Sequence, residues 1–368
     1  MEGDFRSIMH LSYRDYRSIP EGLRGQGSEE ISEIYLKENL IHTLPDWFFV
    51  EMCHLRFLCL AGNMIESLPN QIGRFECLET LDLSENSLHR LPHTVGRLKQ
   101  LTKLLLNGNY LHQLPAELGQ LRKLEVLEIR KNRLTNIPIQ LSQCVALEDL
   151  LMDDNPGLVS VPTRLFNLPR LTYVSAERCN LFQLPCYTNT TTLAFALLFS
   201  NNRSLTHCPL ALERFAPPDY DALEDKVKRI RNPSCYRQLV CKAVPYLLNF
   251  PSELAYVSDR KKVGTAPNSL LATALRVVSR CRVRLDVLER LGLPQCLTTR
   301  LLQGPVAYCA SVPCEKEIFI EAVVALVKRK EYARNFVLSV LFCSKLCADR
   351  WFQYNCDTYE ELSWEIPV

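Results

Sequence analysis

The chain has 368 residues, of which 47% are hydrophobic and 23% are charged, and its formal net charge is +2. This near-neutral balance gives no reason to expect nucleic acid or an anionic membrane as the main partner. No stretch approaches the roughly 18 uncharged apolar residues of a membrane span, and the charged first residues lack the apolar core of a signal peptide.

Sixteen cysteines are a high number for a chain without a signal peptide. In a secreted protein they would indicate disulfides, but the missing leader argues for a reducing compartment. We therefore expect a cytoplasmic or nuclear protein whose thiols are buried as small apolar groups or bind metal.

Asparagines recur at a nearly constant interval from the N-terminus. The first gap is 24 residues, the next four are 23, and the last, of 47, covers two repeats with Cys179 in the intermediate slot. An incomplete first copy is visible in Met9–Pro20. The residues in register are Asn39, Asn63, Asn86, Asn109, Asn132, Asn155 and Asn202.

Each repeat combines an L-x-L-x-x-N segment with a second segment, which reads L-P, two variable residues, an apolar residue and then G-x-L. Alternating leucines are typical of a short strand with one buried face, and the proline fixes φ where the chain turns back. No single repeat can bury its own leucines, so a core forms only by stacking. The pattern resembles the short cytoplasmic type of leucine-rich repeat. We expect an α/β leucine-rich-repeat solenoid of eight to nine repeats over residues 1–211, followed by a small helical, Cys-rich C-terminal domain.

In such a solenoid the parallel strands line a concave face, whose outward residues form a binding surface. This face mixes both signs of charge, which favours a protein partner over a nucleic acid; an ordinary solvated surface is the alternative. The candidate contact residues are Tyr35, Lys37, Glu38, Asp82, Glu85, Glu128, Arg130, Lys131, Asp153, Asp154, Glu177 and Arg178.

The repeat register ends after Pro209, and residues 212–268 are expected to form a cap and a linker. Cys241–Val257 is interpreted as short helix with breaks, and the polar Ser258–Asn268 is the best linker candidate. Asn268 or Ser269 is expected to begin the next helix as its N-cap.

Residues 269–304 contain two motifs in a fixed order. In the first, Leu270, Ala274 and Val278 are four residues apart and form one apolar stripe of a helix. The second is a Leu293–Pro294 turn followed by Leu297 and Leu301 at helical spacing. An ordinary pair of core helices would give the same pattern.

The last segment, residues 305–368, contains Cys309 and Cys314, then Cys343 and Cys347. Two close cysteine pairs can converge on one tetrahedral zinc ion, and four protein ligands would make it structural because no position is left for water. Buried free thiols are the alternative. The intervening residues alternate like strands in their first half, which indicates a small hairpin.

Together these segments, SLLATALRVV, LPQCLTTRLL, CASVPC and FCSKLC, resemble the leucine-rich-repeat substrate receptors of elongin–cullin RING ubiquitin ligases, of the VHL-box or SOCS-box type. The resemblance implies that the solenoid recruits a target protein while the tail docks on elongin B/C and a cullin. Arg300–Leu301 stands where such families often have Tyr-Leu, which leaves the type of cullin open.

Two other functions were considered. An enzyme is not expected, since the chain lacks phosphate-loop, dinucleotide and zinc-protease motifs and its histidines are scattered through the repeats. A leucine-rich-repeat scaffold in intracellular signalling is the main alternative to the ligase receptor, although it does not account for the ordered tail motifs.

Overall fold

The structure is a computed structural model of the whole chain. It describes residues 7–25, 28–184, 196–202, 204–215, 236–241, 247–251, 254–262, 270–280, 293–294, 297–298, 300–301, 304–312, 314, 316–330 and 337–366. The chain divides into two compact units. The first comprises Met1–Leu158, Leu168–Cys179 and Thr191–Leu198, and the second comprises Val159–Asn167, Asn180–Thr190 and Phe199–Val368.

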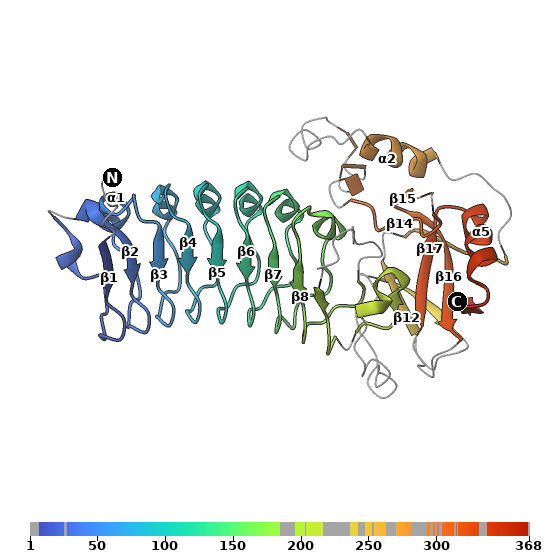
Figure 1. Cartoon of the computed structure of the whole chain (residues 1–368), viewed down its shortest axis with the longest axis horizontal. Coiled ribbons are helices and arrows are strands. Elements are labelled where there is room, and N and C mark those ends of the chain that lie inside the picture. The colour runs from blue at the N-terminus through green and yellow to red at the C-terminus, as the bar shows by residue number, and fades with distance from the viewer. Residues whose placement is uncertain are drawn as a thin grey trace, which may run out of the picture. The chain divides into compact units, whose positions relative to one another are not determined.

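The first unit is built on one nine-stranded sheet in which the strands follow chain order (Figure 1). All neighbouring strands pair in parallel. This arrangement confirms the leucine-rich-repeat solenoid. The strands are β1 (Ser7–His10), β2 (Ile31–Tyr35), β3 (Phe57–Cys59), β4 (Thr80–Asp82), β5 (Lys103–Leu105), β6 (Val126–Glu128), β7 (Asp149–Leu151), β8 (Tyr173–Ser175) and β9 (Ala196–Leu198).

Each repeat returns to the next strand through a short turn that begins after a proline. Pro69, Pro92, Pro115 and Pro138 have φ between −65° and −74°, as the pyrrolidine ring requires. The first return contains the 3₁₀ turns η1 (Glu21–Leu23) and η2 (Ser28–Glu30), and the second is the helix α1 (Asp46–Glu51). The later returns are 3₁₀ turns: η3 (Asn70–Arg74), η4 (His93–Arg97), η5 (Ala116–Gln120) and η6 (Ile139–Gln143), with η7 (Thr163–Asn167) in the second unit.

The returns η3, η4 and η5 pack closely on the next return because each has a glycine at the contact, Gly73, Gly96 or Gly119. A Cβ added to Gly119 would overlap the backbone carbonyl oxygen of Gln140 in the next return. The repeat leucines are buried in the space between the sheet and these turns, as Leu81, Leu83 and Leu104 illustrate with 0% exposure. Stacking therefore produces the core, as the pattern predicted.

The repeat asparagines form a buried ladder that joins neighbouring repeats. The side-chain oxygen of Asn109 accepts a hydrogen bond from the Leu88 N–H at 3.0 Å, and its side-chain amide donates to the backbone carbonyls of Leu83 and Leu106. Asn202 repeats the first of these bonds with the Leu181 N–H, which confirms the last copy as a repeat. Cys179 takes the equivalent slot, with its thiol 3.4 Å from the Met152 carbonyl oxygen.

The residue before each asparagine adopts a left-handed conformation. Glu38, Glu85, Lys131, Asp154 and Arg178 have φ between +52° and +58°, and Gly62 and Gly108 occupy the same slot. The chain therefore turns sharply where each strand ends, and charged side chains fill most of these positions.

The second unit contains more strand than the sequence predicted. Its five-stranded sheet has the order β10-β17-β16-β13, and β18 pairs with the central β16; β12-β11-β19 and the hairpin β14-β15 form two smaller sheets. The strands are β10 (Cys208–Pro209), β11 (Tyr236–Cys241), β12 (Leu247–Pro251), β13 (Tyr256–Asp259), β14 (Ala307–Tyr308), β15 (Glu317–Ile318), β16 (Glu321–Arg329), β17 (Leu338–Phe342), β18 (Tyr359–Leu362) and β19 (Trp364–Glu365).

The interpretation of Cys241–Val257 as broken helix was wrong: β11 ends in this segment, β12 lies within it, and β13 begins in it. These strands are held by long-range pairing, such as that of β11 with β19, which local periodicity does not reveal. The expected hairpin between the cysteine pairs is confirmed as β16 and β17.

The helices α2 (Leu270–Arg280) and α5 (Lys345–Asn355) lie in this unit, together with the 3₁₀ turn η8 (Leu210–Phe215), and residues 297–298 and 300–301 are also helical. Among the described residues, no helix combines the length and the apolar character needed to cross a membrane. The expected N-cap at Asn268 or Ser269 lies outside the described residues. Domain limits at residues 211, 268 and 304 stay a prediction.

Candidate binding face and candidate metal centre

The concave face begins with a row of stacked aromatic rings. The His10 and Tyr35 rings are stacked, with centroids 4.8 Å apart and planes 24° apart, and the Phe57 ring is tilted by 32° to that of Tyr35, with centroids 4.6 Å apart. His10 is directly opposite Tyr35, whereas Phe57 is opposite Glu33 and is therefore the diagonal neighbour of Tyr35 on the same face. This row offers an apolar, partly exposed surface at the N-terminal end of the face.

Most of the predicted face residues lie where the repeat pattern placed them. Tyr35, Asp82 and Glu128 are half-buried on strands β2, β4 and β6. The others follow the strands in the turns. Lys37, Glu38, Glu85, Lys131 and Arg178 are exposed there, and Arg130, Asp154 and Glu177 are half-buried.

Asp153 differs from the others because it is only 6% exposed. Its carboxylate accepts from the Ser175 hydroxyl and, at 2.8 Å, from the Glu177 N–H, and it lies 3.1 Å from the Arg130 guanidinium. These bonds join two repeats. Asp153 is therefore part of the fold, and its expected role as a surface contact residue is corrected.

Arg178 and Asp154 form a two-pronged ion pair in the turns, with N–O distances of 2.7 and 2.9 Å. The hydrogen bonds from Arg178 lower the pKa of the Asp154 carboxyl, and the same bonds raise the pKa of Arg178. Since the pair is half exposed, solvent screens it and its contribution to stability is small.

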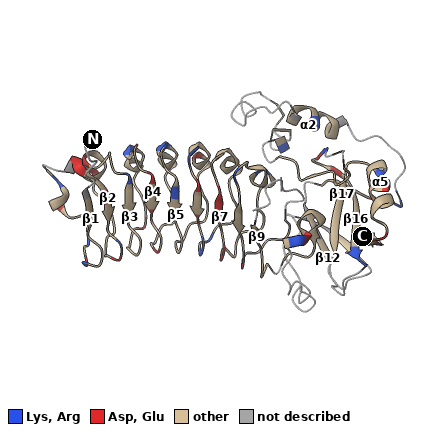
Figure 2. Ribbon diagram, viewed as in Figure 1, with Lys and Arg blue, Asp and Glu red and all other residues tan. Residues whose placement is uncertain are grey.

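The middle of the face is acidic, which the sequence analysis recognised only in part. Residues 79–82, 102–105, 125–128 and 148–151 contain six acidic residues and one basic residue. Figure 2 shows acidic segments on strands of this region beside the one basic segment on β5. We call this group the acidic band; it comprises Glu79, Asp82, Glu125, Glu128, Glu148 and Asp149.

Two members of the band are balanced by arginines within the chain: Glu79 by Arg56, and Glu148 by Arg170 at 3.9 Å. Within the described residues, Asp82, Glu125, Glu128 and Asp149 form no ion pair. Partial burial and then the nearby Glu148 and Glu128 raise the pKa of Asp149. Uncompensated negative charge of this kind favours the approach of a cation.

The second candidate site is a cluster of four thiols in the second unit. Cys309 follows β14, Cys314 lies in the loop to β15, Cys343 follows β17, and Cys347 lies in the first turn of α5. The helix start is fixed by Ser344, whose hydroxyl accepts from the Cys347 N–H at 3.3 Å. Cysteines predicted from their spacing are therefore brought together by four separate segments.

The geometry of the cluster fits a tetrahedral metal ion. The Sγ atoms all lie within 4.8 Å of one another, and Cys343 Sγ is 3.6 Å from that of Cys314 and 3.7 Å from that of Cys347. A disulfide needs about 2.05 Å. Four thiolates about 2.3 Å from one zinc ion lie about 3.8 Å apart, so the donor set and its spacing fit zinc.

Hydrogen bonds between the thiols lower the pKa of one cysteine and raise that of its partner. Bonds from the Cys309, Cys314 and Cys347 thiols lower the pKa of Cys343 to about 5, against the effect of burial. The same bond from Cys309 raises the pKa of Cys309 itself, since its proton is held between two sulfurs. The thiolate form, which is the form that binds metal, is therefore favoured at Cys343.

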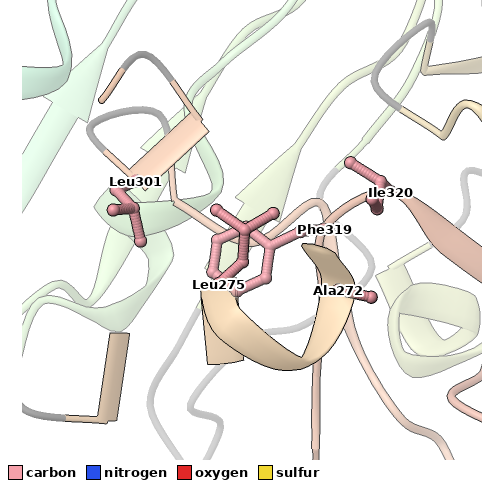
Figure 3. Close-up of a cluster of buried hydrophobic side chains, with 5 residues drawn as sticks. All are labelled: Ala272, Leu275, Leu301, Phe319 and Ile320. Atoms are coloured by element: carbon pink, nitrogen blue, oxygen red, sulfur yellow. The ribbon is translucent and has the colours of Figure 1, made fainter. Parts of the chain in front are cut away.

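Helix α2 packs through a different face from the predicted stripe. Its inward residues are Ala272 and Leu275, each 1% exposed, which contact Phe319, Ile320 and Leu301 (Figure 3). Of the predicted stripe, Ala274 is exposed and Val278 is half-buried against this cluster. Leu270 begins the helix, but its side chain lies outside what the structure describes.

The second motif contributes partly to the same cluster. Leu293 and Leu297 are half-buried against it, and Pro294 is exposed. Leu301 is 2% exposed. Its expected role as a partner contact is therefore corrected: its side chain is buried in the cluster with Leu275 and Phe319.

The fold and the face define a leucine-rich-repeat solenoid protein, a class whose members typically act as protein-binding modules. Sequence models agree: residues 42–110 match a model described as "Leucine-rich repeat region", and residues 99–156 match one described as "Leucine rich repeat".

Two solved structures that resemble part of this chain are of bacterial proteins. A leucine-rich-repeat protein of Leptospira interrogans is 22% identical, with a TM-score of 0.44, and the match covers 55% of this chain and 60% of the other. An internalin of Listeria monocytogenes is 16% identical, with a TM-score of 0.36, over 51% and 47% of the two chains. This chain thus spans about half the length of the solved relatives.

Proposed function

We propose that this protein is a non-enzymatic substrate receptor, which recruits a target protein through the concave face and delivers it to an elongin B/C–cullin RING ubiquitin ligase. Target binding by this protein is supported by the nine-stranded face, which has the aromatic row and the acidic band on one surface. The ordered motifs after the repeats support the ligase half.

The charge and the apolar residues of the concave face indicate which kind of target segment would bind. The acidic band has four carboxylates without a basic partner among the described residues, and half-buried Val126 and Tyr173 lie beside them. A target segment carrying lysine or arginine beside apolar side chains would match both features. Its association should weaken with added salt, since the attraction is electrostatic.

For the adaptor, the proposal uses the exposed face of α2. Leu271 is 41% exposed, Val277 is 58% exposed, and Ala274 lies between them on the helix surface. A small residue between two larger apolar ones lets another helix or loop approach closely. The cullin-contacting segment would begin at Leu293 and the exposed Pro294, and the buried Leu301 would not contribute to it.

The proposal includes one structural zinc ion held by Cys309, Cys314, Cys343 and Cys347. It would link the segment after β14 to β17 and α5, and it would supply no reactive position. A zinc–thiolate site also fits the proposed cytoplasmic or nuclear location, where reducing conditions keep the remaining cysteines free.

Co-purification with elongin B and C tests the receptor proposal. The matched variants are Leu271→Asp with Ala274→Asp on the apolar face, and Thr273→Asp at an exposed polar position of the same helix. Stoichiometric co-purification of the wild type and of Thr273→Asp, lost in the double variant, supports adaptor docking. Failure of the wild type to co-purify would reject the ligase function and leave a signalling scaffold that uses the same concave face.

A further inference from the structure

Two polar side chains of α2 bond to a single residue of the β14–β15 hairpin. The Arg276 Nε donates to the backbone carbonyl oxygen of Glu317 at 2.7 Å, and the Ser279 hydroxyl donates to the Glu317 carboxylate at 2.9 Å. Arg276 is only 8% exposed. A displacement of Glu317 would therefore leave a buried guanidinium group without this acceptor, which is strongly unfavourable.

The next two residues supply the apolar part of the contact. Phe319 and Ile320 are 3% and 1% exposed and pack on Ala272 and Leu275. We call Glu317, Phe319 and Ile320 the α2 seat. Phe319 and Ile320 lead directly into β16, so the large sheet holds them, whereas Glu317 belongs to the hairpin.

The hairpin that carries Glu317 is too small to be stable alone. Its two strands pair only Ala307 with Ile318 and Tyr308 with Glu317. Isolated two-stranded hairpins are marginal in water even when they are longer. Something else must therefore hold the hairpin in place.

The cysteine cluster lies where the hairpin meets the large sheet. The Cys309 N–H donates to the Lys316 carbonyl across the hairpin, and the Ala310 N–H donates to the Leu341 carbonyl on β17. The Cys343 N–H lies 3.4 Å from the Cys309 sulfur. Two of the four thiols thus come from the hairpin and its loop, and two from the end of β17 and from α5.

We propose that metal binding at these four cysteines fixes the β14–β15 hairpin and thereby Glu317, so that the C-terminal half of α2 is held in place for a partner in the metal-loaded protein and loosens without the metal. This inference rests on the zinc site of the proposed function. The metal joins the hairpin to the sheet, the hairpin fixes Glu317, and Glu317 holds the C-terminal half of the helix.

The two halves of α2 should respond differently. Ala272 and Leu275 contact Phe319 and Ile320, which the sheet retains when the metal is removed. Arg276 and Ser279 bond to Glu317, which lies in the small hairpin and not in the large sheet. Loss of the metal should therefore loosen the last turns of α2 more than its first.

Hydrogen exchange of the full-length protein, read by mass spectrometry with and without bound zinc, tests this coupling. Removing zinc with a chelator should speed exchange of residues 276–280 by about tenfold or more, with a smaller change in residues 272–275 and none in β3–β7. Adding zinc back should restore protection, which separates the effect from irreversible misfolding.

Two variants make the result specific. Cys314→Ser should lose zinc and loosen α2, and Ser279→Ala should loosen the end of α2 with zinc content unchanged. A protein that binds one zinc ion but shows the same α2 exchange without it would overturn the coupling and leave the zinc site intact. A protein that binds no zinc would overturn both, whereas elongin co-purification reports separately on the receptor function.

Discussion

The side-chain oxygen of Asn132 accepts a hydrogen bond from the backbone N–H of Leu111, one repeat earlier, at 3.0 Å. The amide of Asn132 donates at the same time to the Leu106 carbonyl at 2.9 Å. A further bond from the same amide goes to the Ile129 carbonyl of its own repeat at 3.2 Å, so one side chain satisfies buried backbone groups of two repeats.

Replacing Asn132 by alanine should therefore be among the most destabilising polar substitutions in the solenoid. The variant leaves buried donors and acceptors unsatisfied, which costs about 2–4 kcal/mol of unfolding free energy. Urea denaturation followed by circular dichroism measures the loss. Asn136→Ala, at an exposed position of the same repeat, is the matched control and should change stability by less than about 0.5 kcal/mol.

Gly119→Ala should also destabilise the solenoid, for a steric reason. The added methyl group would overlap the Gln140 carbonyl oxygen in the next return, so the two repeats must separate. Overpacking of this kind costs roughly 1–3 kcal/mol. Gly22→Ala is the control, because a Cβ there meets nothing within 4 Å. Equal melting temperatures for the two variants would refute the close contact.

Acid should destabilise the second unit through His207. This side chain is buried and stacked on Phe250 with ring centroids 4.2 Å apart, and burial lowers its pKa to about 3. The unfolded chain, with a histidine pKa near 6.5, takes up a proton below that pH while the folded chain does not. Stability due to this group is therefore intact above pH 6.5 and falls by about 1.4 kcal/mol per unit as pH decreases towards 3.

A His207→Phe variant keeps an aromatic ring on Phe250 but cannot bind a proton. Between pH 7 and pH 5 the wild type should lose about 2 kcal/mol more stability than this variant. Unfolding can be followed by the fluorescence of Trp351 and Trp364, which belong to the same unit. Because acid weakens thiolate ligation in both proteins, the difference between their pH slopes isolates the histidine.

Zinc content should depend on each cysteine of the cluster. Cys314→Ser or Cys347→Ser removes one of four ligands, and we expect bound zinc to fall from one per chain to a small fraction by elemental analysis. Cys356→Ser, an exposed cysteine outside the cluster, should retain the metal. Chelation should lower the unfolding temperature of the second unit and leave that of the solenoid unchanged; zinc retained by Cys314→Ser would exclude this ligand set.

The solenoid was predictable because its determinants are local and repeated. The spacing of the asparagines gives the strand positions, and each copy confirms the others. The cysteine cluster was predictable for a related reason: two close pairs mark two turns, although their meeting in space requires β14, β15 and β17 to assemble.

Features that depend on packing between residues far apart in the chain were harder to predict from the sequence. Leu271 and Leu275 have the same spacing as Leu270 and Ala274, so periodicity cannot tell which side of α2 is buried. The burial of Leu301 depends on Phe319, and β11 depends on β19. The acidic band was predicted only in part, because residues such as Glu125 and Glu148 precede the L-x-L segment from which the face was predicted.

The left-handed turns that end the strands have a consequence for protein engineering. Lys131 and Arg178 hold a conformation that glycine adopts more readily, at a penalty of roughly 1 kcal/mol each. Glycine already fills this slot at Gly62 and Gly108. Replacing Lys131 or Arg178 by glycine should thus make the solenoid more stable but remove a charged side chain from its turns. Greater stability and an unchanged binding surface are therefore opposing design goals at these positions.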